Sequence, residues 1–200
     1  MMCVLVKMGN DTRDKMIAGA ASLLSQRGLQ GTSFSDVIEL TDAPRGSIYH
    51  HFPGGKNEMV AEAMALLGTV VAERIQSAEV TRPEEVSDAF VNGWRAFVDI
   101  TDFTSVCAVA AVTVGAGADA EVLLPTVVST FSSWRDALAA AYMKTGLRKP
   151  DAQRLALTAV AALEGALILA RAQQNMEPFD AVQRDLSDLA RAAAARRARA

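Results

Sequence analysis

Apolar residues recur at three- and four-residue intervals along almost the whole chain, which is the spacing of one face of an α-helix. No stretch shows a convincing two-residue alternation of the kind that marks a β-strand. Half of the 200 residues are hydrophobic, so a chain of this length can bury a proper core. These features predict an all-α protein of about nine helices.

Three short helices are expected near the N-terminal end. The first opens at Asp11 and stops at Gly28. The second begins after Ser33, in a Ser-x-x-Asp sequence that resembles a capping box. The third starts at Pro44, which suits a first helical turn, and ends by Phe52 because "FPGG" cannot continue it.

A long helix is then expected over about residues 56–77, and no Gly/Ser-rich tether follows it. Five more helical segments complete the chain, with breaks at sequences such as "SAEVTRP" and "TGLRKPD". They are expected near residues 83–98, 105–114, 121–144, 151–174 and onward to about residue 197.

Composition argues against several classes of protein. The formal net charge is −3, so any anion-binding surface must be local. Cys3 and Cys107 are far apart, which argues against a disulfide framework or a zinc site and fits a reducing cytosol. The longest apolar run, residues 157–170, contains Glu164 and falls short of the ~20 residues that cross a bilayer. Residues 1–10 lack the features of a signal peptide and are expected to form a disordered arm.

The sequence also lacks the motifs of the common enzyme classes. It has no nucleophile elbow, no phosphate-binding glycine loop and no H-E-x-x-H pair, and its glycine-rich "GAGAD" stands alone. We therefore expect no enzyme, no cofactor and no metal site.

The turn between the second and third predicted helices matches a helix-turn-helix layout, which places its second helix in the major groove of DNA. Residues 41–56, "TDAPRGSIYHHFPGGK", have suitable chemistry. Arg45 can contact guanine or a phosphate, Gly46 allows close approach of the backbone, and Ser47 offers a small donor.

Further along the same segment, Tyr49 and His50 can reach flanking phosphates. Lys56 adds a cation at the start of the long helix, where backbone N–H groups are exposed. Ile48 and Phe52, four residues apart, are expected to hold the third helix against the first two.

Each of these residues also has a simpler interpretation. Arg45 could be a solvated cation, although an arginine at a helix N-terminus is unfavourable without a nearby anion. Tyr49 could serve packing. His50 and His51 point about 100° apart on a helix and cannot chelate one metal comfortably, so His51 is expected to be a partly buried packing residue.

The stretch "GLQGTSFSDVIELTDAPRGSIYHHFPGGKNEMVAEA" resembles the DNA-binding head of the TetR family of bacterial regulators, over about residues 12–64. The doubled glycine of "HHFPGGK" resembles the LmrA/YxaF-like branch, and "LEGALILARAQ" resembles the dimerising helix of that branch. Elsewhere only the number and length of the helices agree. The resemblance implies a helix-turn-helix DNA-binding domain at residues 11–56, joined by the long helix to a C-terminal helical bundle for ligand binding and dimerisation at residues 57–200.

The resemblance also implies where DNA is contacted. The family's contacts fall on Thr32, Ser33, Arg45, Ser47, Tyr49, His50 and Lys56. One position departs from the family, which usually has glycine in the bend where this chain has Asp42. Aspartate tolerates the turn conformation but adds a negative charge. It could weaken DNA binding, or it could point away and cap the third helix.

In the family, the C-terminal bundle encloses a pocket for a small, usually hydrophobic effector. The candidate lining residues are Met64, Leu67, Trp94, Phe97, Phe103, Cys107, Phe131 and Trp134. Most of them could equally be ordinary core. Cys107 could be a redox sensor, although a buried thiol is the commoner case.

The helix over residues 151–174 is apolar on two faces, so it must bury both. Together with the last helix it is expected to form the family's four-helix interface of a homodimer, although a fully interior helix of a monomer would show the same pattern. Candidate interface residues are Leu157, Ala161, Glu164, Ile168, Arg171, Val182, Leu186 and Leu189. Glu164 and Arg171 could pair there, or one could contact a ligand.

Taken together, the sequence predicts a cytoplasmic transcriptional repressor that binds a palindromic double-stranded DNA operator as a homodimer and is released by an effector. The alternative is a DNA-binding regulator of the same fold without an effector.

Overall fold

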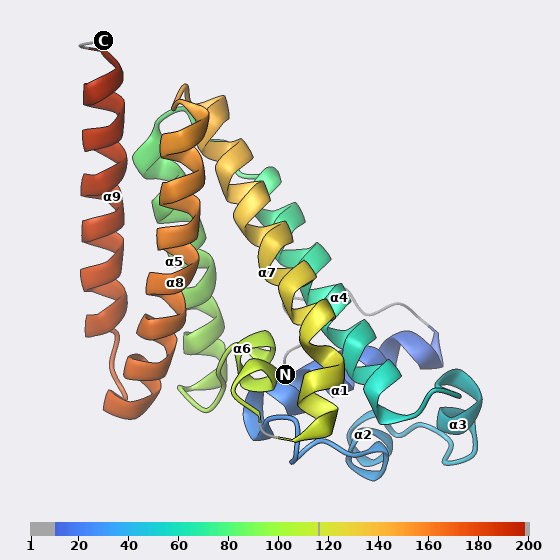
Figure 1. The fold of residues 1–200 in the computed structure, drawn as a ribbon. Coiled ribbons are helices and arrows are strands. Elements are labelled where there is room, and N and C mark those ends of the chain that lie inside the picture. The colour runs from blue at the N-terminus through green and yellow to red at the C-terminus, as the bar shows by residue number, and fades with distance from the viewer. Residues whose placement is uncertain (1–10, 116, 199–200) are drawn as a thin grey trace. The chain divides into compact units, whose positions relative to one another are not determined.

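The computed structural model describes residues 11–115 and 117–198, and the predicted arm at residues 1–10 lies outside them. All regular structure in these ranges is helical, which confirms the all-α class (Figure 1). The helices are α1 (Thr12–Arg27), α2 (Phe34–Thr41), α3 (Ser47–His51), α4 (Lys56–Gln76), α5 (Pro83–Thr101), α6 (Ala108–Thr113), α7 (Ala118–Lys144), α8 (Lys149–Gln173) and α9 (Glu177–Ala198).

The predicted start of the third helix was wrong by three residues. Pro44 does not begin a helix, because the Ser47 N–H donates to the Pro44 carbonyl at 2.9 Å and closes a tight turn before α3. Arg45 and Gly46 therefore lie in this turn, and Gly46 caps α3. The first helix ends where the sequence predicts, with Gly28 as its C-terminal cap, and Asp42 is the C-terminal cap of α2.

Contacts divide the described chain into two compact units. The first holds residues up to Val70 together with Ser105–Thr130, and the second holds Val71–Thr104 together with residues from Phe131 onward. The division falls within α4 and α7. It does not coincide with the predicted boundary after residue 56. That boundary separates the expected DNA-binding region from the expected ligand-binding and dimerisation region, and it stays a prediction.

Helix α1 lies at the centre of the first unit and packs against α2, α3 and α6. Its inner face, Met16, Ala20 and Leu24, is fully buried. The Val106 N–H donates to the Ser25 carbonyl at 2.9 Å, so the segment before α6 is attached to the same helix by a backbone hydrogen bond. The three short helices thus share one core with α6.

In the second unit α9 lies along both α5 and α8 (Figure 1). Edge-to-face aromatic contacts fill part of its core, with ring centroids 5.8 Å apart for Trp94 and Trp134 and 5.4 Å apart for Phe131 and Trp134. The Tyr142 hydroxyl lies 2.8 Å from the Ser87 hydroxyl, and burial raises the pKa of Tyr142 to about 12.

Helix α8 has 25 residues and is, by length and composition, apolar enough to cross a bilayer. The expectation that its apolar run is too short therefore does not hold for the whole helix. A buried helix of a globular core has the same composition, and α8 packs against α9 with Leu155, Leu163 and Leu167 buried. This packing accounts for the apolar character of the buried face of α8, while Leu157 and Ile168 on its other face are exposed.

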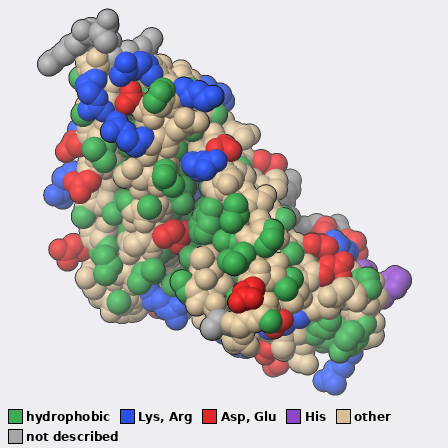
Figure 2. Space-filling model, in the orientation of Figure 1, with side chains coloured by type: hydrophobic (Ala, Val, Ile, Leu, Met, Phe, Trp, Pro, Cys, Tyr) green, Lys and Arg blue, Asp and Glu red, His purple; other side chains and the backbone are tan. Residues whose placement is uncertain are grey.

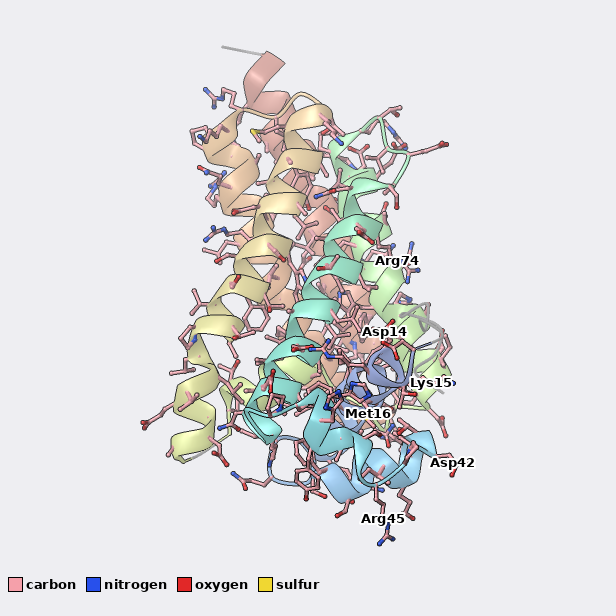
Figure 3. The ribbon with its side chains drawn as sticks, turned by 90° about the vertical axis from the view of Figure 1, so that its right-hand side faces the viewer. Asp14, Lys15, Met16, Asp42, Arg45 and Arg74 are labelled. Carbon is pink, nitrogen blue, oxygen red and sulfur yellow. The ribbon has the colours of Figure 1, made fainter. Side chains whose placement is uncertain are left out.

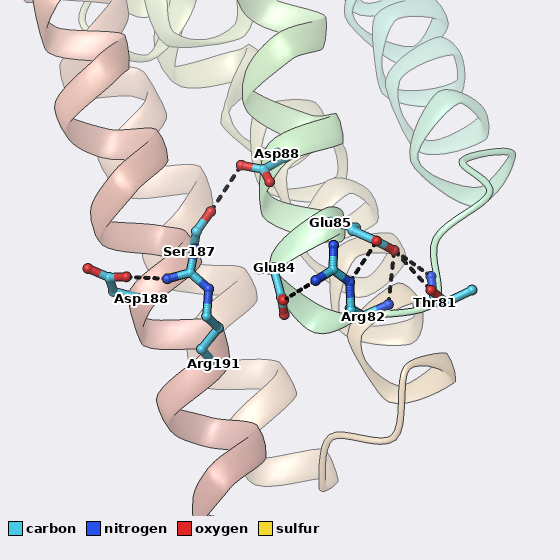
Figure 4. A network of polar contacts seen from close by, with 8 residues as sticks. All are labelled: Thr81, Arg82, Glu84, Glu85, Asp88, Ser187, Asp188 and Arg191. Carbon is cyan, nitrogen blue, oxygen red and sulfur yellow. Dashed lines mark hydrogen bonds and ion pairs between the residues drawn. The ribbon is translucent and has the colours of Figure 1, made fainter.

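Two carboxylates organise the polar contacts of α5 (Figure 4). Glu85 accepts hydrogen bonds from the Thr81 N–H at 2.8 Å, the Arg82 N–H at 3.0 Å and the Arg82 Nε–H at 2.8 Å. These bonds lower the pKa of Glu85 to about 2, the Thr81 backbone bond contributing most. Asp88 accepts bonds of 3.0 Å from both Ser187 and Gln183, which fasten α9 to α5.

We predict that Glu85→Gln flattens the acid limb of the stability profile. Because the pKa of Glu85 lies below its ordinary 4.5, the stability that its charge contributes is complete above about pH 4.5 and is lost as the pH falls toward 2. The unfolding free energy, measured by urea titration at several pH values across this window, should fall less steeply with decreasing pH in the variant than in the wild type. The exposed Glu79, replaced by Gln, serves as control, and identical slopes for all three proteins would contradict the prediction.

Candidate nucleic-acid interface

Helix α2 begins with the predicted capping box. The Ser33 hydroxyl accepts from the Asp36 N–H at 3.2 Å, and the Asp36 carboxylate accepts from the Ser33 N–H at 3.0 Å and from the Ser33 hydroxyl. The hydroxyl bond from Ser33 lowers the pKa of Asp36, with a smaller contribution from Arg27. Local hydrogen bonds therefore fix where α2 starts, as the sequence predicts.

A left-handed residue ends α2 and forms the bend. Asp42 has φ 52° and ψ 34°, and its N–H donates to the Ile38 carbonyl. The Ala43 N–H reaches the same carbonyl at 3.4 Å, so the helix is closed by a compact C-terminal motif. No side chain caps α3, so the suggestion that Asp42 caps it does not hold. Figure 3 shows Asp42 and Arg45 both extending away from the ribbon.

Helix α3 has one buried side and one exposed side. Ile48 and Phe52 are buried, as expected from their spacing. Tyr49 is 69% exposed and contacts the Phe34 ring edge-on, at 5.4 Å between centroids. His50 is exposed as well, and Figure 2 shows histidine at the surface over α3. The exposed side thus offers polar and aromatic groups to a partner.

Arg13 and His51 contact the Phe52 ring, and sequence reasoning missed both the Arg13 contact and the pairing of Arg13 with Glu62. The Arg13 guanidinium lies over the Phe52 ring at 5.3 Å and also pairs with Glu62 of α4. Arg13 and Glu62 are 49 positions apart, so no local signal in the sequence could have paired them. Half-buried His51 contacts the Phe52 ring edge-on, as a packing residue should. This cluster ties α1, the end of α3 and the start of α4 together.

Several of the residues implied as DNA contacts have internal partners, as Ser33 does in its capping box. Lys56 donates from Nζ to the Leu29 carbonyl at 2.7 Å, which leaves its other two N–H groups for an anion. Thr32 is buried, and its hydroxyl donates to the Gly28 carbonyl at 2.9 Å. The Thr32 side chain therefore falls outside the candidate interface. Ser47 keeps its place there, although its hydroxyl also donates to the Pro44 carbonyl at 2.7 Å.

The candidate interface is not strongly basic. Between residues 33 and 56 the cations are Arg45 and Lys56, and the carboxylates are Asp36, Glu39 and Asp42, which gives 2 − 3 = −1 with neutral histidines. In the described part of the chain no group of three His, Cys, Asp or Glu residues is placed to hold a metal ion. Affinity for an anionic partner must therefore rest on a few well-placed cations.

The residues predicted to line an effector pocket divide between the two units and are mostly core. In the first unit Met64, Leu67 and Cys107 are buried. In the second unit Trp94, Phe97 and Trp134 are buried, while Phe103 and Phe131 are half-buried. A small hollow that the sequence did not suggest, of about 120 Å³, lies in the second unit between α8 and α9, lined by Asp151, Arg154, Leu155 and Leu189 among others.

The residues predicted for the dimer interface are mostly exposed on α8 and α9. Leu157, Ile168 and Leu189 are 60%, 57% and 49% exposed. Ala161 and Arg171 are also exposed, while Glu164 and Val182 are half-buried. Leu186 falls outside this surface, because it is 2% exposed inside the second unit. Leu169, which the sequence analysis did not select, is half-exposed on α8. Figure 2 shows hydrophobic side chains on the visible face of these helices.

Two short helices joined by a left-handed bend, with an exposed polar side on the second, define a helix-turn-helix regulator. Comparison with known proteins agrees. The model of the bacterial regulatory proteins of the tetR family matches residues 16–63. The model of the C-terminal domain of LmrA/YxaF-like transcriptional regulators matches residues 83–185. The chain therefore belongs to the TetR family, in its LmrA/YxaF-like branch, and is a DNA-binding transcriptional regulator rather than an enzyme.

Individual relatives extend this agreement over nearly the full length. The chain is 38% identical to Rv0196, an uncharacterised HTH-type transcriptional regulator of Mycobacterium tuberculosis, over 88% of this chain and 93% of the relative. It is 24% identical to the HTH-type regulator LmrA of Bacillus subtilis, over 90% and 96%. A crystal structure of a TetR regulator from Legionella pneumophila shares the fold, with a TM-score of 0.75 at 18% identity over 90% and 97%.

Two glycines near α3 should respond in opposite ways to replacement by alanine. Gly55 has φ +82°, a conformation that costs a side chain about 1–2 kcal/mol, so Gly55→Ala should destabilise the protein by about that amount. Gly46 has φ −73°, and an added Cβ meets nothing within 4 Å, so Gly46→Ala should raise the unfolding free energy by about 0.4–1 kcal/mol. Urea unfolding of both variants at one protein concentration tests this pair, and a loss of stability in Gly46→Ala would contradict it.

Proposed function

We propose that this regulator is a cytoplasmic repressor that binds a palindromic operator as a homodimer and leaves it when a small hydrophobic effector binds. The observation that carries the proposal is the exposed side of the α2–α3 turn and α3. Arg45, Gly46, Tyr49 and His50 face solvent there, while the buried Ile48 and Phe52 hold the element in place.

The chemistry of this surface suits the major groove. Arg45 is free to form a bidentate contact with guanine or to bind a phosphate. Gly46 has no side chain and so lets the backbone approach the duplex. The fold itself does not require a glycine there, because an added Cβ would meet nothing within 4 Å. Tyr49, His50 and the two remaining N–H groups of Lys56 can contact phosphates. The half-exposed Ser33 and Ser47 hydroxyls donate to Asp36 and to the Pro44 carbonyl in the free chain, so they would have to rotate to donate to DNA.

Arg45→Ala should weaken operator binding by about 1–3 kcal/mol, because it removes a base or phosphate contact without touching the core. The full-length wild type first selects duplexes from a randomised pool, and gel shifts then compare variants on the selected duplex, with and without hydrophobic compounds. Lys144→Ala, an exposed cation at the end of α7, should bind as the wild type does. Failure of the wild type to select any sequence, or wild-type binding by Arg45→Ala, would refute DNA recognition by this surface.

The homodimer is supported by the apolar surface that α8 and α9 leave exposed. Leu157, Ala161 and Ile168 lie four and seven residues apart and so share one face of α8, while the opposite face is buried. A single head with so few cations would bind DNA weakly, and a symmetric pair doubles its phosphate contacts. Two recognition elements about 34–36 Å apart would then meet successive turns of the duplex.

Ile168→Glu should convert the homodimer into a monomer, because it places a charge on the proposed apolar interface. Sedimentation of the full chain at micromolar concentration reports the mass. Val122→Glu on α7 is the matched control, since Val122 is similarly exposed, at 65%, but lies outside the proposed interface. A monomeric wild type, or a dimer that survives the change at Ile168 together with one at Leu157, would exclude this interface.

Release by an effector is proposed as a two-state switch. The helix α4 is continuous from Lys56, directly after the α3 loop, to Gln76, and can act as a lever. Couplings of ~1–3 kcal/mol would shift operator affinity about 5- to 150-fold. The alternative, a regulator without an effector, is favoured by the close ring packing of Trp94 and Trp134. A compound that stabilises the fold yet leaves operator affinity unchanged at saturation would support this alternative.

A further inference from the structure

Asp42 places an exposed charge at the bend between α2 and α3. Its φ of 52° lies in the left-handed region, which aspartate tolerates better than most residues with a Cβ. Its carboxylate follows the C-terminus of α2, where the helix dipole already presents partial negative charge. The side chain is exposed and does not cap α3; only the backbone of Asp42 takes part in ending α2. The Asp42 charge therefore gains nothing from the helix dipole and is open to a partner on the same surface.

The backbone position of Asp42 is defined by the fold. The backbone N–H of Asp42 and that of Ala43 both donate to the Ile38 carbonyl, so the bend is closed against the last turn of α2. Asp42, at the end of α2, lies three residues before Arg45, in the turn before α3, and both extend away from the ribbon (Figure 3). The surface that meets DNA in the proposed function therefore carries an anion and a cation three residues apart in the sequence.

We propose that Asp42 is a specificity-determining residue, which excludes DNA registers that would place a phosphate against the α2–α3 bend. The inference rests on the proposed binding of α3 in the major groove. Sequence-independent binding is held almost entirely by phosphates and samples many registers, so a carboxylate at the bend removes some of them. The operator complex uses one register, set by base contacts, in which no phosphate meets Asp42.

The test compares the full-length wild type with Asp42→Asn, which removes the charge and keeps a side chain that tolerates the left-handed bend. Glu39→Gln, an exposed carboxylate on α2, is the matched control for loss of one negative charge. Asp42→Gly, which also removes the backbone strain, shows whether stability alone changes binding. The probes are the duplex selected by the wild type and the unselected random pool, each measured over a range of salt.

Asp42→Asn should bind the random pool about five-fold more tightly, which is the factor expected when the repulsion between a carboxylate and a phosphate about 4 Å apart in water is removed. It should bind the selected duplex almost as the wild type does. The gain should shrink as salt rises. Glu39→Gln should gain less on the random pool, and Asp42→Gly should behave as Asp42→Asn in binding while unfolding at a higher temperature.

An equal gain on both probes would overturn the proposal, since Asp42 would then only repel DNA. No gain on either probe, or the same gain in Glu39→Gln, would overturn it as well. All of these results leave DNA binding by α3 intact. A wild type that selects no duplex would instead remove the proposed function, and this inference with it.

Discussion

A helix of five residues is too short to hold its shape in water, because nucleation is unfavourable and isolated helices become stable only near 12–15 residues. Helix α3 therefore depends on its buried side. Phe52 is anchored by the Arg13 guanidinium, which also pairs with Glu62, so one side chain of α1 joins the end of α3 to the first turns of α4. Ile48 completes the contact with the core. The exposed side of α3 is presented in a defined position only because this opposite side is fixed.

The parts of the fold that the sequence predicted are those with local causes. Gly28 and the Ser33–Asp36 box act within a few residues, and both appear where expected. Pro44 was misleading because its restricted φ suits a tight turn as well as a helix start. Thr32 and Leu186 show the remaining limit. Whether a small hydroxyl or a leucine is buried depends on distant segments, which one sequence without its relatives does not reveal.

The two apolar faces of α8 have different surroundings. One face is buried with Leu155, Leu163 and Leu167, and it lies against α9 in the core of the second unit. The other face, with Leu157 and Ile168, stays exposed in the single chain. Periodicity could identify both faces but could not say which one the chain itself covers. Polar bonds from Ser187 and Gln183 to Asp88 add a further constraint, because they hold α9 at one register on α5.

The shortness of α3 has a consequence for the information that the protein can read. A helix of little more than one turn reaches only a few base edges, and a sequence of a few base pairs recurs by chance many times in a genome. A single copy of the chain would therefore be unable to mark one gene among thousands. In the proposed homodimer, the distance between two short sequences would add to specificity, so that a promoter would be recognised by the separation of its half-sites as well as by their base sequences.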